Sequence, residues 1–222
     1  MTELKRDELA RMIDHTILET SATKEDVERV CGEAIKYGFG AVCTYVRFLP
    51  ILKERLKGTD IKAVAVIDFP EGKGSPEAKR REAREALGLG ADELDMVIDK
   101  EALKRRDYRR ALEGIRGVVD EAHPRKVKVI IETCDLTHEE KVAACVISKL
   151  GGAAFVKTST GFGKGGARPE DVALMKDLVG DDVEVKASGG IRTYEDAKRM
   201  IEAGATRIGA SKSIAILEGA PD

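Results

Sequence analysis

Short apolar runs alternate with longer amphipathic segments along the whole chain. The runs are rich in Val, Ile and Ala and have the length of buried β-strands, whereas the segments between them repeat apolar residues at helical spacing. A short helix over residues 4–12 is expected before the first run. The expected strands are 12–18, 40–46, 62–69, 91–99, 127–133, a run ending at Lys157, a run ending at Lys186, and 206–211.

Capping residues mark where the helices between these strands begin. Thr23 is suited to accept a hydrogen bond from the first turn of a helix, and Thr137 opens a capping-box pattern, T-x-x-E. Ser75 precedes Pro76, a residue favoured at the first helical position. The expected helices are 24–37, 48–57, 76–87, 101–121 with a bend near Gly114 or Gly117, one opening at 137–140, one opening at Pro169, 194–203 and 212–217.

Eight strands that alternate with eight helices predict a single (β/α)₈ TIM barrel over residues 1–222. The links from helix to strand are short, and no segment between them has the composition of a linker. An open, doubly wound sheet usually has fewer strands, and no G-x-G-x-x-G motif follows the first strand. The barrel is therefore the favoured α/β architecture.

Composition excludes several classes of partner and location. Lys and Arg number 38 against 40 Asp and Glu, so no global field attracts nucleic acid or an anionic membrane. No apolar run has the length that spans a bilayer, and the first residues lack the apolar core of a signal peptide, so a cytoplasmic location is expected. Charged residues make up 35% of the chain and Asn and Gln are absent, which is typical of proteins from thermophiles and also of redesigned sequences.

The cysteines and histidines do not indicate a metal site. Four cysteines lie far apart with no C-x-x-C pair, which favours buried thiols over zinc ligands. The histidines, His15, His123 and His138, are scattered and are expected to be capping or surface residues. The basic run 79–84 is expected to form a solvated helix face.

Two of the expected strands end in lysine, a residue that resists burial unless it is paired or does chemistry. Inward-facing side chains of a barrel strand follow a period of two. This parity places Lys157 and Lys186 inside the barrel, and it places Asp95 inside because Leu94 and Met96 face the helices. A carboxylate and two amines are therefore expected to converge at one end of the barrel.

Two neighbouring lysines cannot both hold a proton easily, so the pKa of one should fall. Lowering it from ~10.4 to about 7 takes roughly 4–5 kcal/mol, which burial and one adjacent cation can supply. A neutral amine attacks carbonyls, so the pattern predicts Schiff-base chemistry in which Asp95, acting through a water, moves protons. The alternative is that Lys157 and Lys186 merely form structural ion pairs with Asp95. Lys128 and Glu184 are expected to neutralise each other beneath the amines, so Glu184→Leu is expected to lower stability.

The loops after the last three strands are rich in glycine and serine, whose backbone N–H groups can point at an anion. Loops in this part of a barrel are a recurrent phosphate site. The expected phosphate-binding residues are Gly161, Gly189, Gly190, Gly209 and Ser211. The residues expected to line the substrate site at other strand ends are Asp14, Thr16, Cys43 and Thr158.

Eight motifs follow one another along nearly the whole chain: IDHTIL, AVCTYVRFLP, VAVIDFPEG, GADELDMVID, KVIIET, FVKTSTGF, VKASGGIRT and RIGAS. In these motifs and their order, the sequence resembles the deoxyribose-phosphate aldolases, a family of class I aldolases. The resemblance implies reversible cleavage of 2-deoxy-D-ribose 5-phosphate to acetaldehyde and D-glyceraldehyde 3-phosphate, without metal or organic cofactor. It also implies that Lys157 forms the Schiff base, that Lys186 tunes it, and that Asp95 transfers protons.

The chain departs from the pattern of the family's bacterial members at two loop positions. Phe162 stands where a lysine often follows the KTSTG motif, and Lys212 stands where a second serine follows GAS. Lys164 or Lys212 is expected to supply the positive charge. The resemblance also implies a homo-oligomer. Three other functions are open: an aldolase for another sugar phosphate, a phosphate-binding isomerase with a carboxylate base, and a non-catalytic sugar-phosphate binder.

Overall fold

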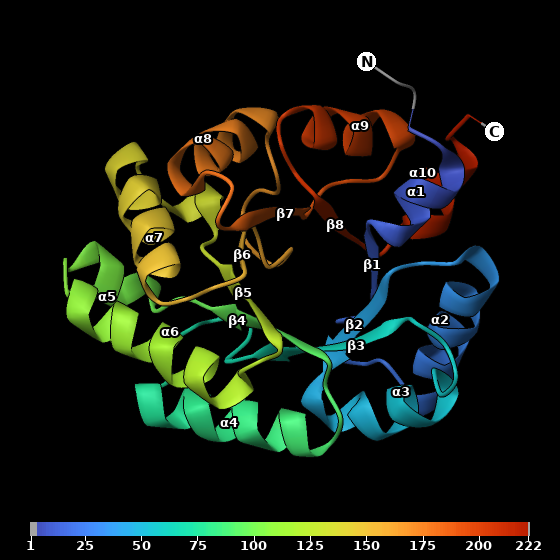
Figure 1. Ribbon diagram of the computed structural model, residues 1–222, viewed down its shortest axis with the longest axis horizontal. Helices are drawn as coiled ribbons and strands as arrows, with labels where there is room; N and C mark the ends of the chain where they lie inside the picture. The colour runs from blue at the N-terminus through green and yellow to red at the C-terminus, as the bar shows by residue number, and fades with distance from the viewer. Residues whose placement is uncertain (1–3, 222) are drawn as a thin grey trace.

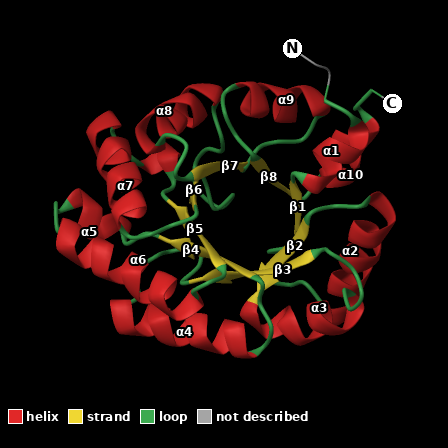
Figure 2. Cartoon of the chain, in the orientation of Figure 1, coloured by secondary structure: helices red, strands yellow, loops and turns green. Residues whose placement is uncertain are grey.

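The computed structural model describes residues 4–221, which form a closed barrel of eight parallel strands in sequence order (Figures 1 and 2). Each strand pairs with its neighbours along the chain, and β1 closes the barrel against β8. The predicted TIM barrel is thus confirmed. The strands are β1 (Ile13–Thr16), β2 (Ala41–Tyr45), β3 (Lys62–Ile67), β4 (Glu93–Val97), β5 (Lys126–Ile130), β6 (Phe155–Lys157), β7 (Glu184–Ser188) and β8 (Arg207–Ala210).

Helices surround the barrel (Figure 2), and the predicted short helix before the first strand is present. The α-helices are α1 (Arg6–Arg11), α2 (Lys24–Tyr37), α3 (Leu49–Arg55), α4 (Pro76–Gly88), α5 (Lys100–Lys104), α6 (Tyr108–Ala122), α7 (His138–Leu150), α8 (Pro169–Val179), α9 (Tyr194–Glu202) and α10 (Ser213–Glu218). Two short 3₁₀ helices, η1 (Val46–Phe48) and η2 (Thr133–Asp135), follow β2 and β5.

The predicted caps are present at the helix starts. The hydroxyls of Thr23, Ser75 and Thr137 accept hydrogen bonds from backbone N–H groups in the first turns of α2, α4 and α7, at 3.2–3.3 Å. Gly38 ends α2 with φ of 71°, a left-handed conformation that glycine adopts without strain. Local chemistry therefore fixes where these helices begin and end.

The predicted single helix over 101–121 is wrong. The chain forms two helices, because Arg106 adopts φ of 59° and Asp107 accepts a hydrogen bond from the N–H of Arg110 at 3.1 Å, starting a new helix. The second of these helices, α6, runs without a break through Gly114, which is buried where α6 crosses the side chain of Lys79. A Cβ on Gly114 would lie 3.6 Å from the lysine Cδ.

The two faces of the strands have different environments. Outward residues such as Leu94 and Met96 join one large apolar core between barrel and helices. The interior has an apolar side at β2 and β3 and a charged side toward the other strands. Its apolar residues are Ala41, Cys43, Val64 and Val66, together with Leu18. Side-chain parity therefore separates packing from chemistry.

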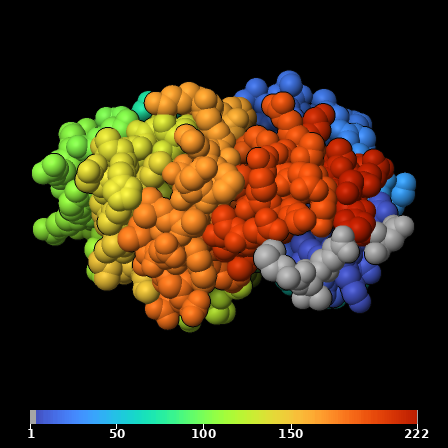
Figure 3. Space-filling view, turned by 90° about the horizontal axis from the view of Figure 1, so that it is seen from above, coloured from blue at the N-terminus to red at the C-terminus, as the bar shows by residue number. Residues whose placement is uncertain are grey.

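The first and last segments of the chain lie together. Figure 3 shows the C-terminal part in red beside the N-terminal part in blue, in agreement with the pairing of β1 and β8. Within residues 4–221, no helix is long and apolar enough to cross a membrane.

Candidate active site

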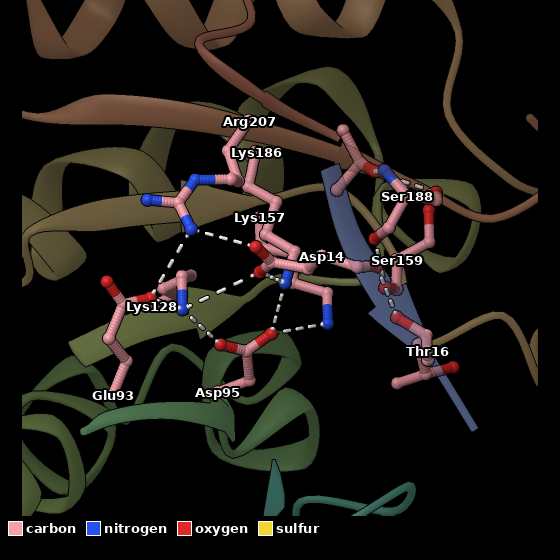
Figure 4. Close-up of polar contacts among 12 residues, drawn as sticks. Asp14, Thr16, Glu93, Asp95, Lys128, Lys157, Ser159, Lys186, Ser188 and Arg207 are labelled. Carbon is pink, nitrogen blue, oxygen red and sulfur yellow. Dashed lines mark hydrogen bonds and ion pairs between the residues drawn. The ribbon is translucent and has the colours of Figure 1, made fainter. Parts of the chain in front are cut away.

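A cluster of charged side chains fills the interior of the barrel (Figure 4). Strands β1 and β4–β8 each contribute at least one member. All of them are buried except Arg207, which is 16% exposed at its side chain. The carboxylates are Asp14, Glu93 and Asp95, and the cations are Lys128, Lys157, Lys186 and Arg207.

Asp95 is the centre of this cluster. Its Oδ2 accepts hydrogen bonds from the Nζ atoms of Lys157 at 2.8 Å and Lys186 at 2.7 Å, and its Oδ1 accepts one from Lys128 at 2.8 Å. Burial acts to raise the pKa of Asp95, but the three ammonium groups outweigh it and hold the pKa well below its usual value. Asp95 is therefore a carboxylate that joins the two lysines of the expected site.

The two lysines differ in their carboxylate partners. Lys186 also donates to Asp14 Oδ2, and although burial opposes its charge, Asp14 and Asp95 together raise its pKa. For Lys157, burial is the largest influence on the pKa; it and the positive charge of Lys186 outweigh Asp95 and lower the pKa. Lys157 is thus the amine that loses its proton more readily, and Lys186 remains an ammonium.

The net charge of the whole cluster also favours a neutral Lys157. The three carboxylates face four cationic groups, so the cluster has an excess positive charge when every member is ionised. An uncompensated charge in a buried site is costly. Deprotonation of Lys157 removes this excess, whereas Lys128 and Arg207 each hold carboxylate partners and keep raised pKa values despite burial.

A cavity of about 660 Å³ opens above the cluster and has Lys157 in its wall. All five predicted phosphate-loop residues line it, as do two further cations, Arg192 and Lys212. Gly189 and Gly190 have φ of 83° and 77°, so glycine is required for the turn that passes the cavity. The amine and the glycine-rich loops therefore face the same space.

Residues 9–219 match the DeoC/LacD family of aldolases, and this match covers nearly the whole barrel. The chain belongs to this family.

Relatives of this DeoC/LacD family member carry a more specific name. A deoxyribose-phosphate aldolase from Thermococcus kodakarensis is 56% identical over 99% of this chain and 100% of its own length. One from Clostridium perfringens is 52% identical, over 97% of both chains. Among solved structures, the tetrameric deoxyribose phosphate aldolase from Aeropyrum pernix has a TM-score of 0.90 and 33% identity, covering 96% of this chain and 91% of its own.

The residues expected to line the substrate site divide into two groups. Thr16 lines the cavity of this family member. Asp14 is fully buried and acts on the site through its contact with Lys186, while Cys43 is buried in the apolar side of the interior, where its thiol pKa is raised to about 11, mainly by burial. Thr158 is also buried and donates a hydrogen bond to the carbonyl of Ser188 at 3.0 Å, which joins β6 to β7.

The residues at and near the two loop positions that depart from the family pattern differ in whether they line the cavity. Lys212 lines the cavity, whereas Lys164 is 74% exposed at its side chain and lies 3.9 Å from Asp135. Phe162 lines the cavity too, and its ring contacts that of Phe69 edge-on, with centroids 5.4 Å apart. An aromatic ring and a cation therefore share the rim of this cavity.

The expected pair of Lys128 and Glu184 is wrong. Lys128 lies 2.6 Å from Glu93 and 2.8 Å from Asp95, because β5 is paired with β4 at that level. Glu184 is 41% exposed at its side chain, where it pairs with Lys126 at 2.9 Å and accepts from Thr206 at 2.8 Å. The reason for expecting Glu184→Leu to lower stability, its pairing with Lys128, therefore fails.

Two other expectations of exposure are wrong. His15 is buried, although His123 and His138 are exposed as expected. Lys79, within the supposedly solvated basic run, is 1% exposed and donates to Asp68 and to the carbonyls of Gly72 and Val97. Three of the cysteines are buried, as predicted, and the fourth is partly buried.

One residue that holds the cavity wall in place was missed because it lies inside an expected strand. Glu132 follows β5, adopts φ of 58°, and accepts hydrogen bonds from the N–H of Thr160, at 3.1 Å, and from its hydroxyl. Thr160 and the adjacent Gly161 line the cavity. The sequence signal that could have identified Glu132 is an acidic residue directly after an apolar, strand-like run.

Within residues 4–221, no group of three or more histidine, cysteine or acidic side chains is placed to hold a metal ion.

Proposed function

We propose that the chain catalyses the reversible cleavage of 2-deoxy-D-ribose 5-phosphate to acetaldehyde and D-glyceraldehyde 3-phosphate, with Lys157 as the Schiff-base lysine. The observation that carries the proposal is the contrast between two buried lysines on one carboxylate: the pKa of Lys157 is lowered and that of Lys186 is raised. The name shared by relatives that cover nearly the whole chain supports the choice of substrate.

The reaction begins when neutral Lys157 attacks the C1 carbonyl of the open-chain sugar, giving a carbinolamine that loses water to form an imine. Removal of the proton from the C3 hydroxyl then breaks the C2–C3 bond. This releases glyceraldehyde 3-phosphate and leaves an enamine of acetaldehyde on the lysine. Protonation at C2 and hydrolysis of the imine release acetaldehyde and restore Lys157.

The neighbouring charges serve these steps. Asp95 accepts hydrogen bonds from both lysines, so it can receive a proton and, through water, return it to the reacting carbons. Lys186 keeps a positive charge beside the imine. In the free site, the same charge helps to lower the pKa of Lys157, which favours loss of its proton. Around the mouth, Arg192, Lys212 and the glycine loops offer cations and N–H groups to the substrate phosphate.

Borohydride reduction in the presence of acetaldehyde, followed by peptide mass analysis, tests the covalent step. We expect a two-carbon adduct on Lys157 in the parent protein and in Lys198→Leu, a control at an exposed position on α9. The Lys157→Leu variant should lose the adduct and nearly all turnover of deoxyribose 5-phosphate in a coupled assay. An adduct located on another lysine would refute the assignment.

The same experiments separate the rival functions. An isomerase with a carboxylate base needs no imine and would survive Lys157→Leu. An aldolase for a different sugar phosphate would form the adduct with a different aldehyde or ketone and leave deoxyribose 5-phosphate uncleaved. A binding protein would retain the sugar phosphate without turnover.

The proposal includes a homo-oligomer in the cytoplasm, drawn from the sequence and from the tetrameric Aeropyrum pernix relative. Light scattering coupled to size-exclusion chromatography measures the mass in solution, and a mass equal to the 24.1 kDa of one chain would exclude an oligomer. The expectation of a thermophilic source is tested by a thermal midpoint above the mesophilic range, which ends at about 65 °C.

A further inference from the structure

A buried histidine lies on the outer face of the strand that carries Asp14 and Thr16. His15 is 3% exposed and lies between α2 and α10, which flank β1 in Figure 1. Its Nδ1 lies 2.9 Å from Ser213 Oγ on α10, and its Nε2 lies 2.7 Å from Glu33 Oε2 on α2. The ring also packs against Phe39, with centroids 5.0 Å apart.

The partner of this histidine closes a turn at the substrate cavity. Ser213 Oγ lies 2.9 Å from the carbonyl oxygen of Ala210, to which its hydroxyl can donate. The two residues enclosed by that contact, Ser211 and Lys212, line the 660 Å³ cavity. Ser211 also lines an adjoining cavity of about 210 Å³ whose wall includes His15. The histidine and the larger cavity therefore lie on opposite sides of one short turn.

The number of protons decides how many of these contacts can form at once. The Ser213 hydroxyl has one hydrogen, so its contacts with Ala210 and with His15 are both hydrogen bonds only if the hydroxyl donates to Ala210 and His15 Nδ1 donates to the hydroxyl. The short contact with Glu33 needs a proton on Nε2 as well. All three hydrogen bonds therefore exist together only in the doubly protonated ring. The neutral ring must give up one of them.

We propose that His15 is a positioning residue that fixes the Ala210–Ser213 turn, and through it Ser211 and Lys212, against the phosphate of the substrate. The positioning role rests on the proposed function, because it takes Ser211 and Lys212 to bind the phosphate of the substrate. His15 itself touches no reacting atom. Its contribution is therefore expected in the affinity for phosphorylated ligands and not in the chemistry at Lys157.

The groups around the ring set the pH at which this contact changes. Glu33 favours the charged ring, while Arg29, 2.7 Å from Glu33, opposes it, and Asp26 lies 3.7 Å from Arg29. Ser213 and the Ala210 carbonyl face the ring from the other side. Burial is the largest influence and lowers the pKa of His15 below its usual value. The fully bonded turn is therefore favoured on the acid side of neutrality.

Steady-state kinetics with two substrates test the proposal. For His15→Phe we expect the KM for deoxyribose 5-phosphate and the inhibition constant of inorganic phosphate to rise about fivefold, the loss typical of one hydrogen bond, with kcat within about twofold. The kcat/KM for unphosphorylated 2-deoxyribose should stay unchanged. Ser213→Ala should give the same pattern, and the double variant should add little to either single change.

The matched variant is His15→Asn, whose amide can donate to Ser213 but cannot titrate. It should keep the parent affinity for inorganic phosphate near pH 5. The ratio of the parent KM to that of His15→Asn should fall as the pH decreases from 7.5 to 5, and the titration of the substrate phosphate cancels in this ratio. A flat ratio would remove the protonation step from the proposal.

Three results would overturn the positioning role. They are an equal loss for phosphorylated and unphosphorylated substrates, no change in His15→Phe and Ser213→Ala, and full additivity in the double variant. Ser213→Ala removes only a hydroxyl, so it provides the test if His15→Phe does not fold. Borohydride trapping of acetaldehyde on Lys157 should be equal in all variants and the parent. If the parent protein itself gave no trapped adduct on Lys157, that result would instead refute the proposed function.

Discussion

Lys157 and Lys186 donate hydrogen bonds to the same atom, Oδ2 of Asp95, at 2.8 and 2.7 Å. Two ammonium groups on one oxygen repel each other, and the repulsion is relieved when one loses its proton. Lys186 has a second carboxylate, Asp14, and Lys157 does not share that partner. The asymmetry in carboxylate partners therefore sets which lysine loses its proton more readily.

Replacing Lys186 should make Lys157 harder to deprotonate. In Lys186→Met the neighbouring positive charge is gone while Asp95 remains, so the pKa of Lys157 rises. We expect turnover at pH 7 to fall at least about a hundredfold and the acid limb of the rate profile to move to higher pH. Lys198→Met, an exposed lysine changed in the same way, should leave the profile as it is. An acid limb at the parent pH would contradict this account.

Two substitutions at residues outside the cavity lining should shift the pKa of Lys157 in opposite directions. Arg207→Met removes a cation that lies 2.8 Å from Asp14, so the pKa of Lys157 should rise and the acid limb should move up by roughly half a pH unit. Glu93→Gln removes an anion that lies 2.6 Å from Lys128, so the limb should move down. Rates of imine trapping measured against pH give both shifts. Movement in the same direction would show that the charge count is not the cause.

Glu132 should matter for substrate affinity because it anchors the backbone and hydroxyl of Thr160. In Glu132→Ala the loop that carries Gly161 loses both contacts, and we expect the KM for deoxyribose 5-phosphate to rise about fivefold to tenfold. Glu132→Gln keeps one acceptor oxygen and should fall between the parent and the alanine variant. Glu139→Ala, on an exposed part of α7, is the control. A parent-like KM in Glu132→Ala would exclude an anchoring role.

Lys79 should contribute to stability and Arg81, two residues along α4, should not. Lys79→Met removes a buried donor from Asp68 and from two carbonyls, which should lower the free energy of unfolding by about 2–3 kcal/mol, since Asp68 keeps some solvent contact. Arg81 is exposed, and Arg81→Met should change stability by less than about 0.5 kcal/mol. Urea unfolding of both variants measures the difference. Equal midpoints would contradict the burial of this lysine.

The barrel and its central residues could be predicted from the sequence because both follow from period-two parity. Once the strands are placed, the closed topology brings Asp95, Lys157 and Lys186 to one interior without any knowledge of side-chain contacts. The position of the glycine-rich loops around the cavity follows from the same geometry, since the last three strands are adjacent.

The sequence could not reveal polar residues whose partners are distant in the chain. His15 looks like a polar residue on a strand, and only the fold brings Ser213, 198 residues away, to its ring. Lys79 lies in a basic run, and its burial depends on the carbonyls of Gly72, in the loop after β3, and of Val97, at the end of β4. The break before α6 depends on a left-handed Arg106, a conformation that no residue type there favours.

The apolar side of the barrel interior can vary independently of its charges. Ala41, Cys43, Val64 and Val66 pack with Leu18 and bring no charge to the interior. Their size can therefore change while the balance of charge around Lys157 and Lys186 stays intact. Of these five residues, Leu18 lines the cavity, so it is the position at which selection, or an engineer, could make room for a bulkier aldehyde without altering that balance.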